Sequence, residues 1–481
     1  MDGETKGALW SWSATQIAKA VRARDISCVE AVESCLSRID AVNPALNAIV
    51  DYFPDEARAA AKRADEAVAR GDELGLLHGV PVTFKINADY EGKATTNGVV
   101  AYKNVIAPGD APVVANWKKA GAIAVGRTNV PAFSTRYFSD NDLHGRTLNP
   151  WRDDITPGGS SGGAASAVAS GMGALAHGND RAGSIRQPAY CCGIYGLRPS
   201  FGRVPAFNPS ARFDRPLSSQ FTSVQGPLAR SIADLRVALT AMCAGDVRDP
   251  WWVPAPLYGP GERAGEPKRV ALVTGLPDEL FAPEVRKAVA DAGRWLQEAG
   301  YAVDEVKLPM LAEAQKIFYG LVMTEERAAG SQSAIDTLGD ERVKRARGDT
   351  LSYSTHYDAP GYIAALARRT AMIREFALLM QQYPLVVLPV SWLLPLPIDT
   401  DQKGEKAVHA MLDGFRPLVA MSLLGLPSLA APTGLANGIP VGVQIVASRF
   451  REDLCFAAGE VIESRTSVRT PIDPRSGSGR T

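Results

Sequence analysis

The spacing of apolar residues predicts that the chain begins with helices. Ser13-x-x-Gln16 and Ser27-x-x-Glu30 both match the N-terminal capping box, and apolar residues at helical spacing follow each of them. A third helix is expected over 55–69, where alanines are mixed with oppositely charged side chains, and glycines then end it. Region 1–75 is therefore expected to be helical.

After residue 75, patterns typical of strands and helices alternate. Buried strands are predicted over 76–84 and 122–125, and helices over 113–120 and 164–176. A strand–helix–strand unit is predicted over 269–274, 283–299 and 301–306. The stretch 312–382 is predicted to be mostly helical, with a polar break that contains aromatic residues at 352–362. A last buried strand is predicted over 385–390. The stretch 204–265, rich in Pro, Gly and Arg around one helix at 231–244, is expected to be a surface excursion and linker. This alternation predicts an α/β protein with helices on the faces of a sheet.

Composition narrows the class of protein. Hydrophobic residues make up 46% of the 481 residues and charged residues 22%, as in ordinary globular proteins. Lys plus Arg and Asp plus Glu are 52 each, so no chain-wide charge favours nucleic acid or an anionic membrane. The longest apolar run, 384–398, contains several prolines and is shorter than the roughly 20 residues that a membrane helix needs. We expect neither a nucleic-acid nor a membrane partner.

Cysteine usage and the N-terminus point to the cytoplasm. The six cysteines form no C-x-x-C pair and no plausible zinc arrangement with the five histidines, so we expect them to be reduced and mostly buried, with Cys191 and Cys192 in the core. The first seven residues include acidic side chains and no apolar stretch behind a basic start, unlike a secretory signal. A cytoplasmic protein without a metal ion is the expectation.

The most unusual segment is Pro157-Gly-Gly-Ser-Ser-Gly-Gly-Ala-Ala-Ser166. A phosphate-binding loop would need a Lys-Ser/Thr pair after the glycines, which is missing. A nucleophile elbow, Gly-x-Ser-x-Gly, is matched twice, centred on Ser160 and on Ser161, but the preceding residues are polar and contain two prolines rather than a hydrophobic strand. The glycines also suit a helix that simply packs closely against its neighbours.

Two further segments favour acyl-transfer chemistry. The turn from Gly178 to Pro188 places Ser184 among residues able to expose successive backbone N–H groups, as an oxyanion hole requires. Upstream, an apolar strand ends at Lys85, where burial would favour the neutral amine, which is a competent base.

Taken in order, these segments resemble the amidase signature family of serine hydrolases. The resemblance continues through Gly126-Arg-Thr-Asn129, residues 193–199, Gly425-Leu-Pro427, Pro432-Thr-Gly434 and Ile439-Pro-Val-Gly-Val-Gln444, so it covers nearly the whole chain. It implies the amidase-signature fold, a mixed central β-sheet with helices on both faces. It also implies a Ser-cisSer-Lys triad with Ser184 as nucleophile, Ser160 as the bridging serine after a cis peptide bond, and Lys85 as base.

The resemblance also assigns roles around the triad. The oxyanion would be held by the backbone N–H groups of Arg181, Ala182, Gly183 and Ser184. Ser161 is expected to have a structural or hydrogen-bonding role beside the shuttle, and Asp180 and Arg186 are expected to form an ion pair that holds the turn. The chain departs from the family pattern at Ala182 (usually Gly), at Asn179 (usually Thr) and at Ile86 (often Asp), but no triad member is lost.

The implied organisation is one large domain. Its parts are the helical region 1–75, the amidase signature catalytic core 76–265, a continuation of the α/β core over 266–470 with a substrate-pocket helical insertion at about 310–382, and a flexible tail over 471–481. Aromatic and other residues in the divergent middle suggest a pocket for a small neutral, aromatic amide, although core packing explains any one of them equally well: Tyr319, Met323, Tyr353, His356, Tyr357, Tyr362 and Trp392.

The expected function is amide C–N hydrolysis through an acyl-enzyme on Ser184. Carbamate, hydrazide or aryl-ester hydrolysis is the nearest alternative, because these reactions pass through the same kind of intermediate. A second alternative is the glutamine-hydrolysing subunit of an amidotransferase, which would need a partner protein. No cofactor is implied, and we expect a monomer or homodimer acting on a small-molecule amide or carbamate.

Overall fold

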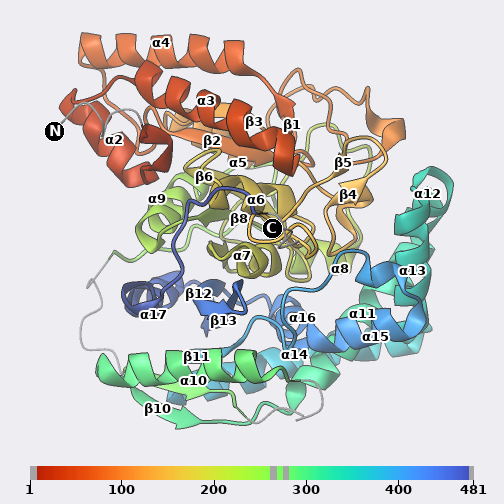
Figure 1. Cartoon of the computed structure of the whole chain (residues 1–481). Helices are drawn as coiled ribbons and strands as arrows, with labels where there is room; N and C mark the ends of the chain where they lie inside the picture. The colour runs from red at the N-terminus through yellow and green to blue at the C-terminus, as the bar shows by residue number, and fades with distance from the viewer. Residues whose placement is uncertain (1–7, 260–267, 275–280, 476–481) are drawn as a thin grey trace, which may run out of the picture.

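The computed structural model describes residues 8–259, 268–274 and 281–475. Eleven strands form one mixed sheet that runs through both halves of the chain (Figure 1). In spatial order they are β1 (Ile49–Tyr52), β3 (Ile123–Thr128), β2 (Pro81–Lys85), β6 (Leu175–Asp180), β8 (Val224–Ala229), β7 (Tyr195–Arg198), β12 (Ser428–Ala436), β13 (Ile439–Ala447), β11 (Leu385–Pro389), β9 (Arg269–Leu272) and β10 (Ala302–Glu305). A separate two-stranded ribbon joins β4 (Asp140–Asn141) and β5 (Gly145–Arg146).

Helices cover both faces of the sheet, as expected from the sequence. One face packs against α2 (Ala14–Ala23), α3 (Cys28–Leu46), α4 (Pro54–Arg70), α5 (Pro112–Lys119), α9 (Ile232–Met242), α10 (Pro283–Glu298) and α17 (Glu452–Arg465). The other packs against α6 (Gly162–Ala169), α7 (Arg186–Cys192), α11 (Met310–Ala328), α14 (Ala359–Gln382), α15 (Glu405–Gly414) and α16 (Arg416–Leu424). The remaining helices are α8 (Leu217–Thr222), α12 (Ser331–Leu338) and α13 (Glu341–Tyr353), with 3-10 turns at Leu9–Ser11, Val100–Tyr102, Ala132–Ser134 and Thr400–Gln402.

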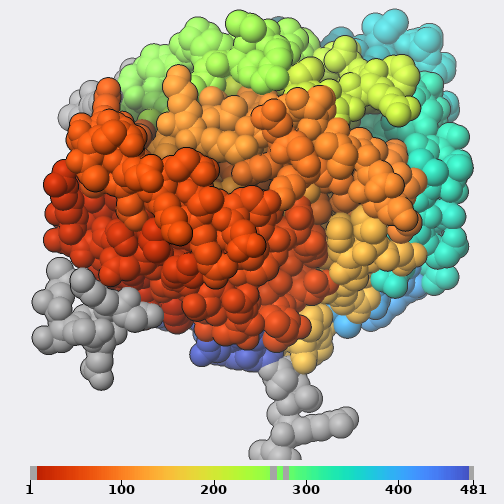
Figure 2. Space-filling model, turned by 90° about the horizontal axis from the view of Figure 1, so that it is seen from above, coloured from red at the N-terminus to blue at the C-terminus, as the bar shows by residue number. Residues whose placement is uncertain are grey.

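The core is divided by the sheet, because successive side chains of a strand point to opposite faces. On β11, Val387 belongs to one hydrophobic cluster, while Val386 and Leu388 belong to the other. Seen from above, the N-terminal helices in red and orange cover much of one surface, and the yellow-green to green segment around residues 200–250 lies along its edge (Figure 2). Within the residues that the structure describes, both faces of the sheet are therefore covered by packed side chains.

Several expectations about local structure are confirmed. Both capping boxes close, with Ser13 and Ser27 as N-caps. The predicted strand–helix–strand unit is β9, α10 and β10, and its two strands pair in parallel. The break in the helical stretch falls between α13 and α14. Cys191 and Cys192 are buried, and all six cysteines are free thiols.

Three local predictions were wrong. The region 1–75, which was expected to be helical, also contains the edge strand β1, which pairs antiparallel with β3. The strand expected over 76–84 begins only at Pro81. The helix expected over 164–176 ends at Ala169, and its supposed last turn is already β6. Gly171 and Gly173 lie between the two elements with φ of 79° and 118°, a conformation that ends a helix and that side-chain-bearing residues rarely adopt.

The interpretation of 204–265 as surface excursion and linker was wrong in one important part. Its residues 224–229 form β8, in the middle of the sheet between β6 and β7. Gly226 and Pro227 obscure the strand pattern. The glycine is required by the neighbouring strand, because a Cβ at Gly226 would lie 2.3 Å from the Leu197 carbonyl oxygen.

Other expectations fall at the edges of the described residues. The boundary predicted near 266 lies in the undescribed range 260–267. Of the tail predicted from 471, Ile472 is buried and Asp473 pairs with Arg38 at 2.7 Å, while 476–481 lie outside the described residues. Within the described ranges no single helix is long and apolar enough to cross a bilayer; α15 and α16 reach that composition only as a pair, with a 60° bend between them.

Candidate active site

The fold brings the three predicted triad residues together. Lys85 is the last residue of β2, Ser160 directly precedes the Ser161 N-cap of α6, and Ser184 lies in the turn between β6 and α7. The Lys85 Nζ lies 2.7 Å from the Ser160 Oγ, and the Gly159–Ser160 peptide is cis. Ser160 and Ser184 both line one cavity of about 380 Å³, which we call the catalytic cavity. Because β2 and β6 are parallel neighbours, their carboxyl ends meet at the same edge of the sheet.

Lys85 is fully buried, and its surroundings favour the neutral amine. Burial lowers the pKa of Lys85 well below its usual value, and the nearby Asp180 carboxylate only partly opposes this effect. Besides Ser160, Lys85 Nζ contacts the Asn179 side-chain oxygen, also at 2.7 Å. A neutral amine that donates one N–H to Asn179 has its lone pair available for a proton from Ser160.

A buried histidine supports the backbone of Lys85. The Lys85 N–H donates to His177 Nδ1 at 3.4 Å, and the other ring nitrogen, Nε2, donates to the side-chain oxygen of Gln225 at 2.8 Å. Burial and the nearby Lys85 lower the pKa of His177 to about 4, although the Gln225 contact raises it. His177 is therefore neutral at pH 7, and it contributes no charge to this region.

Asp180 organises the turn that holds Ser184. Its carboxylate accepts hydrogen bonds from the backbone N–H groups of Gly183 at 2.8 Å and Ile185 at 3.2 Å. It also pairs with Arg186 at 3.0 Å and Arg198 at 3.3 Å, which confirms the expected Asp180–Arg186 ion pair. Burial alone would raise the pKa of Asp180, but the two arginines hold it below its usual range, so the carboxylate stays ionised.

The turn leaves backbone N–H groups free beside Ser184, but not all four that were expected. The Gly183 N–H is occupied by Asp180, whereas within the described chain those of Arg181, Ala182 and Ser184 have no hydrogen-bond partner. The Tyr137 hydroxyl donates to the Ala182 carbonyl oxygen at 2.9 Å, and the Ser161 N–H donates to the Ser184 carbonyl oxygen at 3.2 Å. These contacts fix the orientation of the turn.

A small cavity of about 60 Å³ with a mixed polar and apolar lining, which we call the acyl-side cavity, opens beside Ser184. Two of the predicted pocket residues, Tyr319 and Met323, line it from α11. The sequence interpretation missed other lining residues, both apolar or aromatic (Tyr137, Phe318, Val322, Met411 and Leu412) and charged (Arg136, Arg347 and Asp401). Phe318 and Val322 have the same four-residue spacing as Tyr319 and Met323, so the helical period alone could have found them.

The other five predicted pocket residues line neither the catalytic cavity nor the acyl-side cavity. Tyr353 stacks edge-on against Tyr319, with ring centroids 5.5 Å apart, and donates to Asp413 at 2.7 Å. The remaining four lie elsewhere: Tyr357 packs over Gly320, Tyr362 donates to Glu325, His356 is exposed, and Trp392 is buried in the core.

The structure places each of the three residues that depart from the family pattern. Ile86 is buried in the core, and its N–H donates to the Thr128 carbonyl oxygen at 3.1 Å. Ala182 lines the acyl-side cavity, and Asn179 is bound to Lys85. Among the residues that the structure describes, no three His, Cys, Asp or Glu side chains come together as a metal ion would require.

Comparison with known proteins identifies the family. The family model described as Amidase matches residues 30–456. The chain is 46% identical over 465 residues to an indoleacetamide hydrolase of Bradyrhizobium diazoefficiens, covering 96% of this chain and 88% of that protein. It is 32% identical to a glutamyl-tRNA(Gln) amidotransferase subunit of Alkalilimnicola ehrlichii, covering 94% and 96%. A bacterial aryl acylamidase structure superposes with a TM-score of 0.82 at 27% identity, covering 94% and 96%. The chain therefore belongs to the amidase signature family and is an amidase, a hydrolase of amide C–N bonds.

Proposed function

We propose that this amidase hydrolyses small aromatic primary amides of the arylacetamide type through an acyl-enzyme on Ser184. The observation that carries the proposal is the 2.7 Å contact between Lys85 Nζ and Ser160 Oγ in the wall of the cavity that also holds Ser184. The substrate class is supported by the 46% identical indoleacetamide hydrolase and by the aromatic and thioether side chains beside Ser184. Such side chains suit a planar apolar acyl group.

In the proposed reaction, neutral Lys85 takes a proton from Ser160, which in turn takes the proton of the Ser184 hydroxyl. The Ser184 Oγ forms a bond to the amide carbon, and the relay returns the proton to the nitrogen as the C–N bond breaks. Water then attacks the ester of Ser184, and the carboxylic acid leaves. The oxyanion of each tetrahedral intermediate is proposed to lie against the free N–H groups of Arg181, Ala182 and Ser184.

The setting of the enzyme is also proposed. We infer a cytoplasmic monomer or homodimer that acts on a small-molecule amide or carbamate without a nucleic-acid or membrane partner. Six free cysteines support a reducing compartment, and the formal net charge of zero gives no general attraction to nucleic acid or anionic lipid.

The experiment is a matched substrate panel: an arylacetamide, an aryl carbamate, an aryl hydrazide, an aryl ester and glutamine. We expect the arylacetamide to be turned over fastest. Ser184→Ala, Ser160→Ala and Lys85→Ala should each lower kcat by about 10³-fold or more, because each removes one member of a unit that works together. His356→Ala, a change of an exposed residue outside the cavities, is the control and should keep activity within about twofold.

Each alternative has its own outcome in this panel. Preferred turnover of the carbamate, hydrazide or ester would replace the amide proposal with the corresponding reaction. Turnover of glutamine alone would favour the amidotransferase reaction. Near wild-type activity in a folded Ser184→Ala protein would refute the proposed nucleophile.

A further inference from the structure

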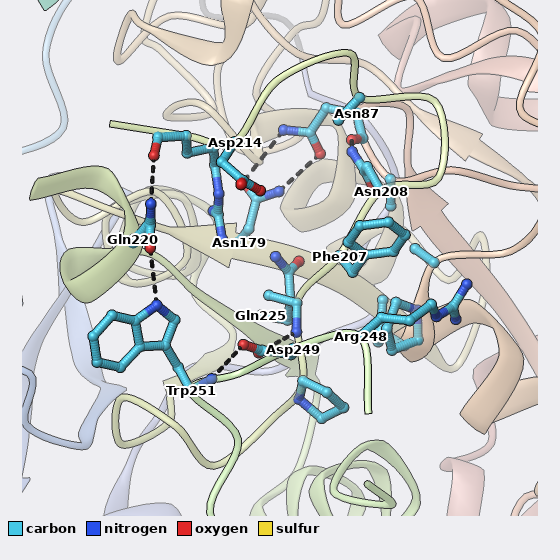
Figure 3. A pocket seen from close by; sticks show the side chains of 18 of the residues that line it. Asn87, Asn179, Phe207, Asn208, Asp214, Gln220, Gln225, Arg248, Asp249 and Trp251 are labelled. Carbon is cyan, nitrogen blue, oxygen red and sulfur yellow. Dashed lines mark hydrogen bonds between the residues drawn. The ribbon is translucent and has the colours of Figure 1, made fainter. Parts of the chain in front are cut away.

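A second, larger cavity of about 690 Å³, the outer cavity, adjoins the catalytic cavity (Figure 3). The two share five lining residues: Asn87, Asn97, Asn179, Arg215 and Gln225. The outer cavity shares no lining residue with the acyl-side cavity, which shares Ser134, Thr135, Arg181 and Ser184 with the catalytic cavity. The catalytic cavity thus lies between the acyl-side cavity and the outer cavity. An amide whose acyl group lies toward the acyl-side cavity has its leaving nitrogen on the side of the outer cavity.

Two of the five shared residues have their hydrogen-bonding groups occupied by the protein. Asn179 accepts from Lys85 and donates to the Asn87 side-chain oxygen at 2.8 Å. Asn87 in turn donates to the Ser134 hydroxyl at 2.9 Å. Figure 3 shows Asn179 and Asn87 bonded to each other on one side of the pocket. These two carboxamides belong to the wall, and they leave little capacity for a ligand.

The other three shared residues have free groups, and all of these groups are donors. Gln225 uses its oxygen on His177, and Asn97 uses its oxygen on Ser134 at 2.6 Å, so each keeps an NH₂ group without a partner in the described chain. The Arg215 guanidinium makes no hydrogen bond or ion pair with any described residue. Free donors that line one junction favour an acceptor-rich group, and a guanidinium favours an anionic one.

The charges around the junction single out Arg215. Of the two arginines that line the catalytic cavity, Arg181 is paired with Glu326 at 2.8 Å, whereas Arg215 is unpaired within the described ranges. The carboxylates near Arg215 are Asp214 and Asp249. Asp249 already accepts from the backbone N–H groups of residues 206 and 251, and Asp214 is solvent-exposed. Neither carboxylate neutralises Arg215 by direct contact.

We propose that the outer cavity is a leaving-amine subsite, and that Arg215, with Gln225 and Asn97, binds a carboxylate carried by the leaving amine. This inference rests on the proposed function and extends its substrate class to N-arylacetyl amino acids. The chemistry is the same and balances: water cleaves the amide C–N bond, giving the arylacetic acid and the free amino acid. A cavity of several hundred Å³ has room for a group of this size.

The test compares N-arylacetylglycine with an uncharged analogue of similar length, the N-propyl arylacetamide, and with the primary arylacetamide. We expect the wild-type enzyme to prefer the carboxylate over the propylamide by at least about 10-fold in kcat/KM, chiefly through KM. Arg215→Met should abolish that preference, and Arg215→Lys should retain part of it. Arg63→Met is the matched control, because Arg63 is exposed on α4 and lines none of the three cavities; it should leave the preference within about twofold.

A binding measurement separates this inference from the proposed function. Titration of N-arylacetylglycine and of the propylamide into the Ser184→Ala protein needs no turnover. N-arylacetylglycine should bind about 10-fold more tightly than the propylamide. In the double variant with Arg215→Met, the two compounds should bind equally. Equal binding and equal turnover of the two compounds would overturn the subsite while leaving arylacetamide hydrolysis intact. Tight, Arg215-dependent binding without turnover of any arylacetyl amide would support the subsite and refute the proposed reaction.

Discussion

The contact between Asn179 and Lys85 gives a prediction with a definite sign. The Asn179 oxygen accepts from Lys85 Nζ at 2.7 Å, and the orientation of this carboxamide is fixed by its own donation to Asn87. We infer that Asn179 is a positioning residue that directs the lone pair of Lys85 toward Ser160. Asn179→Asp keeps the shape of this side chain but places a carboxylate against the amine.

The size of the effect follows from the geometry. Two unit charges at the 2.7 Å of this contact interact by about 6 kcal/mol at an effective dielectric constant of about 20, and one pKa unit corresponds to about 1.4 kcal/mol. The upper limit is therefore a rise of about 4 units in the pKa of Lys85. Because the buried carboxylate itself loses solvation, we expect a rise of about 1–2 units.

The assay is kcat/KM for an arylacetamide as a function of pH. In the proposed mechanism activity requires neutral Lys85, so we expect wild-type activity to rise with pH through the lowered pKa of Lys85. In Asn179→Asp the same rise should move to higher pH, so that activity at neutral pH falls about 10- to 100-fold and recovers in alkaline buffer. Asn179→Leu removes an acceptor that stabilises the ammonium form, so it should move the rise to lower pH while lowering kcat.

Opposite shifts of the pH profile in Asn179→Asp and Asn179→Leu would indicate a direct effect on the pKa of Lys85. Asn179→Thr retains an acceptor oxygen and should keep the rise near its wild-type position. A pH profile that stays in place in both Asn179→Asp and Asn179→Leu, with activity lost only in proportion to protein stability, would refute the reasoning.

Two further predictions concern the turn that holds Ser184. Asp180→Asn should lower the free energy of unfolding by about 3–5 kcal/mol, because it leaves the buried Arg186 and Arg198 without a carboxylate. Urea denaturation measures the free energy of unfolding, and a loss of less than about 1 kcal/mol would contradict the prediction. Tyr137→Phe removes the hydrogen bond to the Ala182 carbonyl oxygen, which contributes about 1 kcal/mol. This variant should lower kcat about 5-fold while the unfolding midpoint in urea changes little. An unchanged kcat would show that this hydrogen bond does not position the turn.

The chemistry of the active site could be predicted from the sequence because it resides in short segments. The Gly/Ser-rich segment and the turn around Ser184 carry their chemistry in local order, and an apolar strand leading to Lys85 already predicts a buried, neutral amine. Caps and helices with a clear period were found for the same reason, since each depends on residues three or four positions apart.

The features that could not be predicted from the sequence depend on contacts between residues that are distant in the chain. The central strand β8 is obscured by Gly226 and Pro227, and only the close approach of Leu197 explains the glycine. The lining of the acyl-side cavity was only partly predicted. The direction in which α11 presents its side chains decides that Tyr319 and Met323 line this cavity beside Ser184.

The tertiary structure also decided which polar groups are used and which are free. Asn179, Asn87 and His177 have no local signal, yet they surround Lys85 because β2, β6 and β8 lie side by side in the sheet. Arg215 lies in a stretch that the sequence suggested was linker. It lines the catalytic cavity because the loop before α8 lies at the edge of the sheet where β2 and β6 end and β8 begins. Local sequence determines the chemistry of each segment, whereas burial and hydrogen-bond partners depend on contacts between segments.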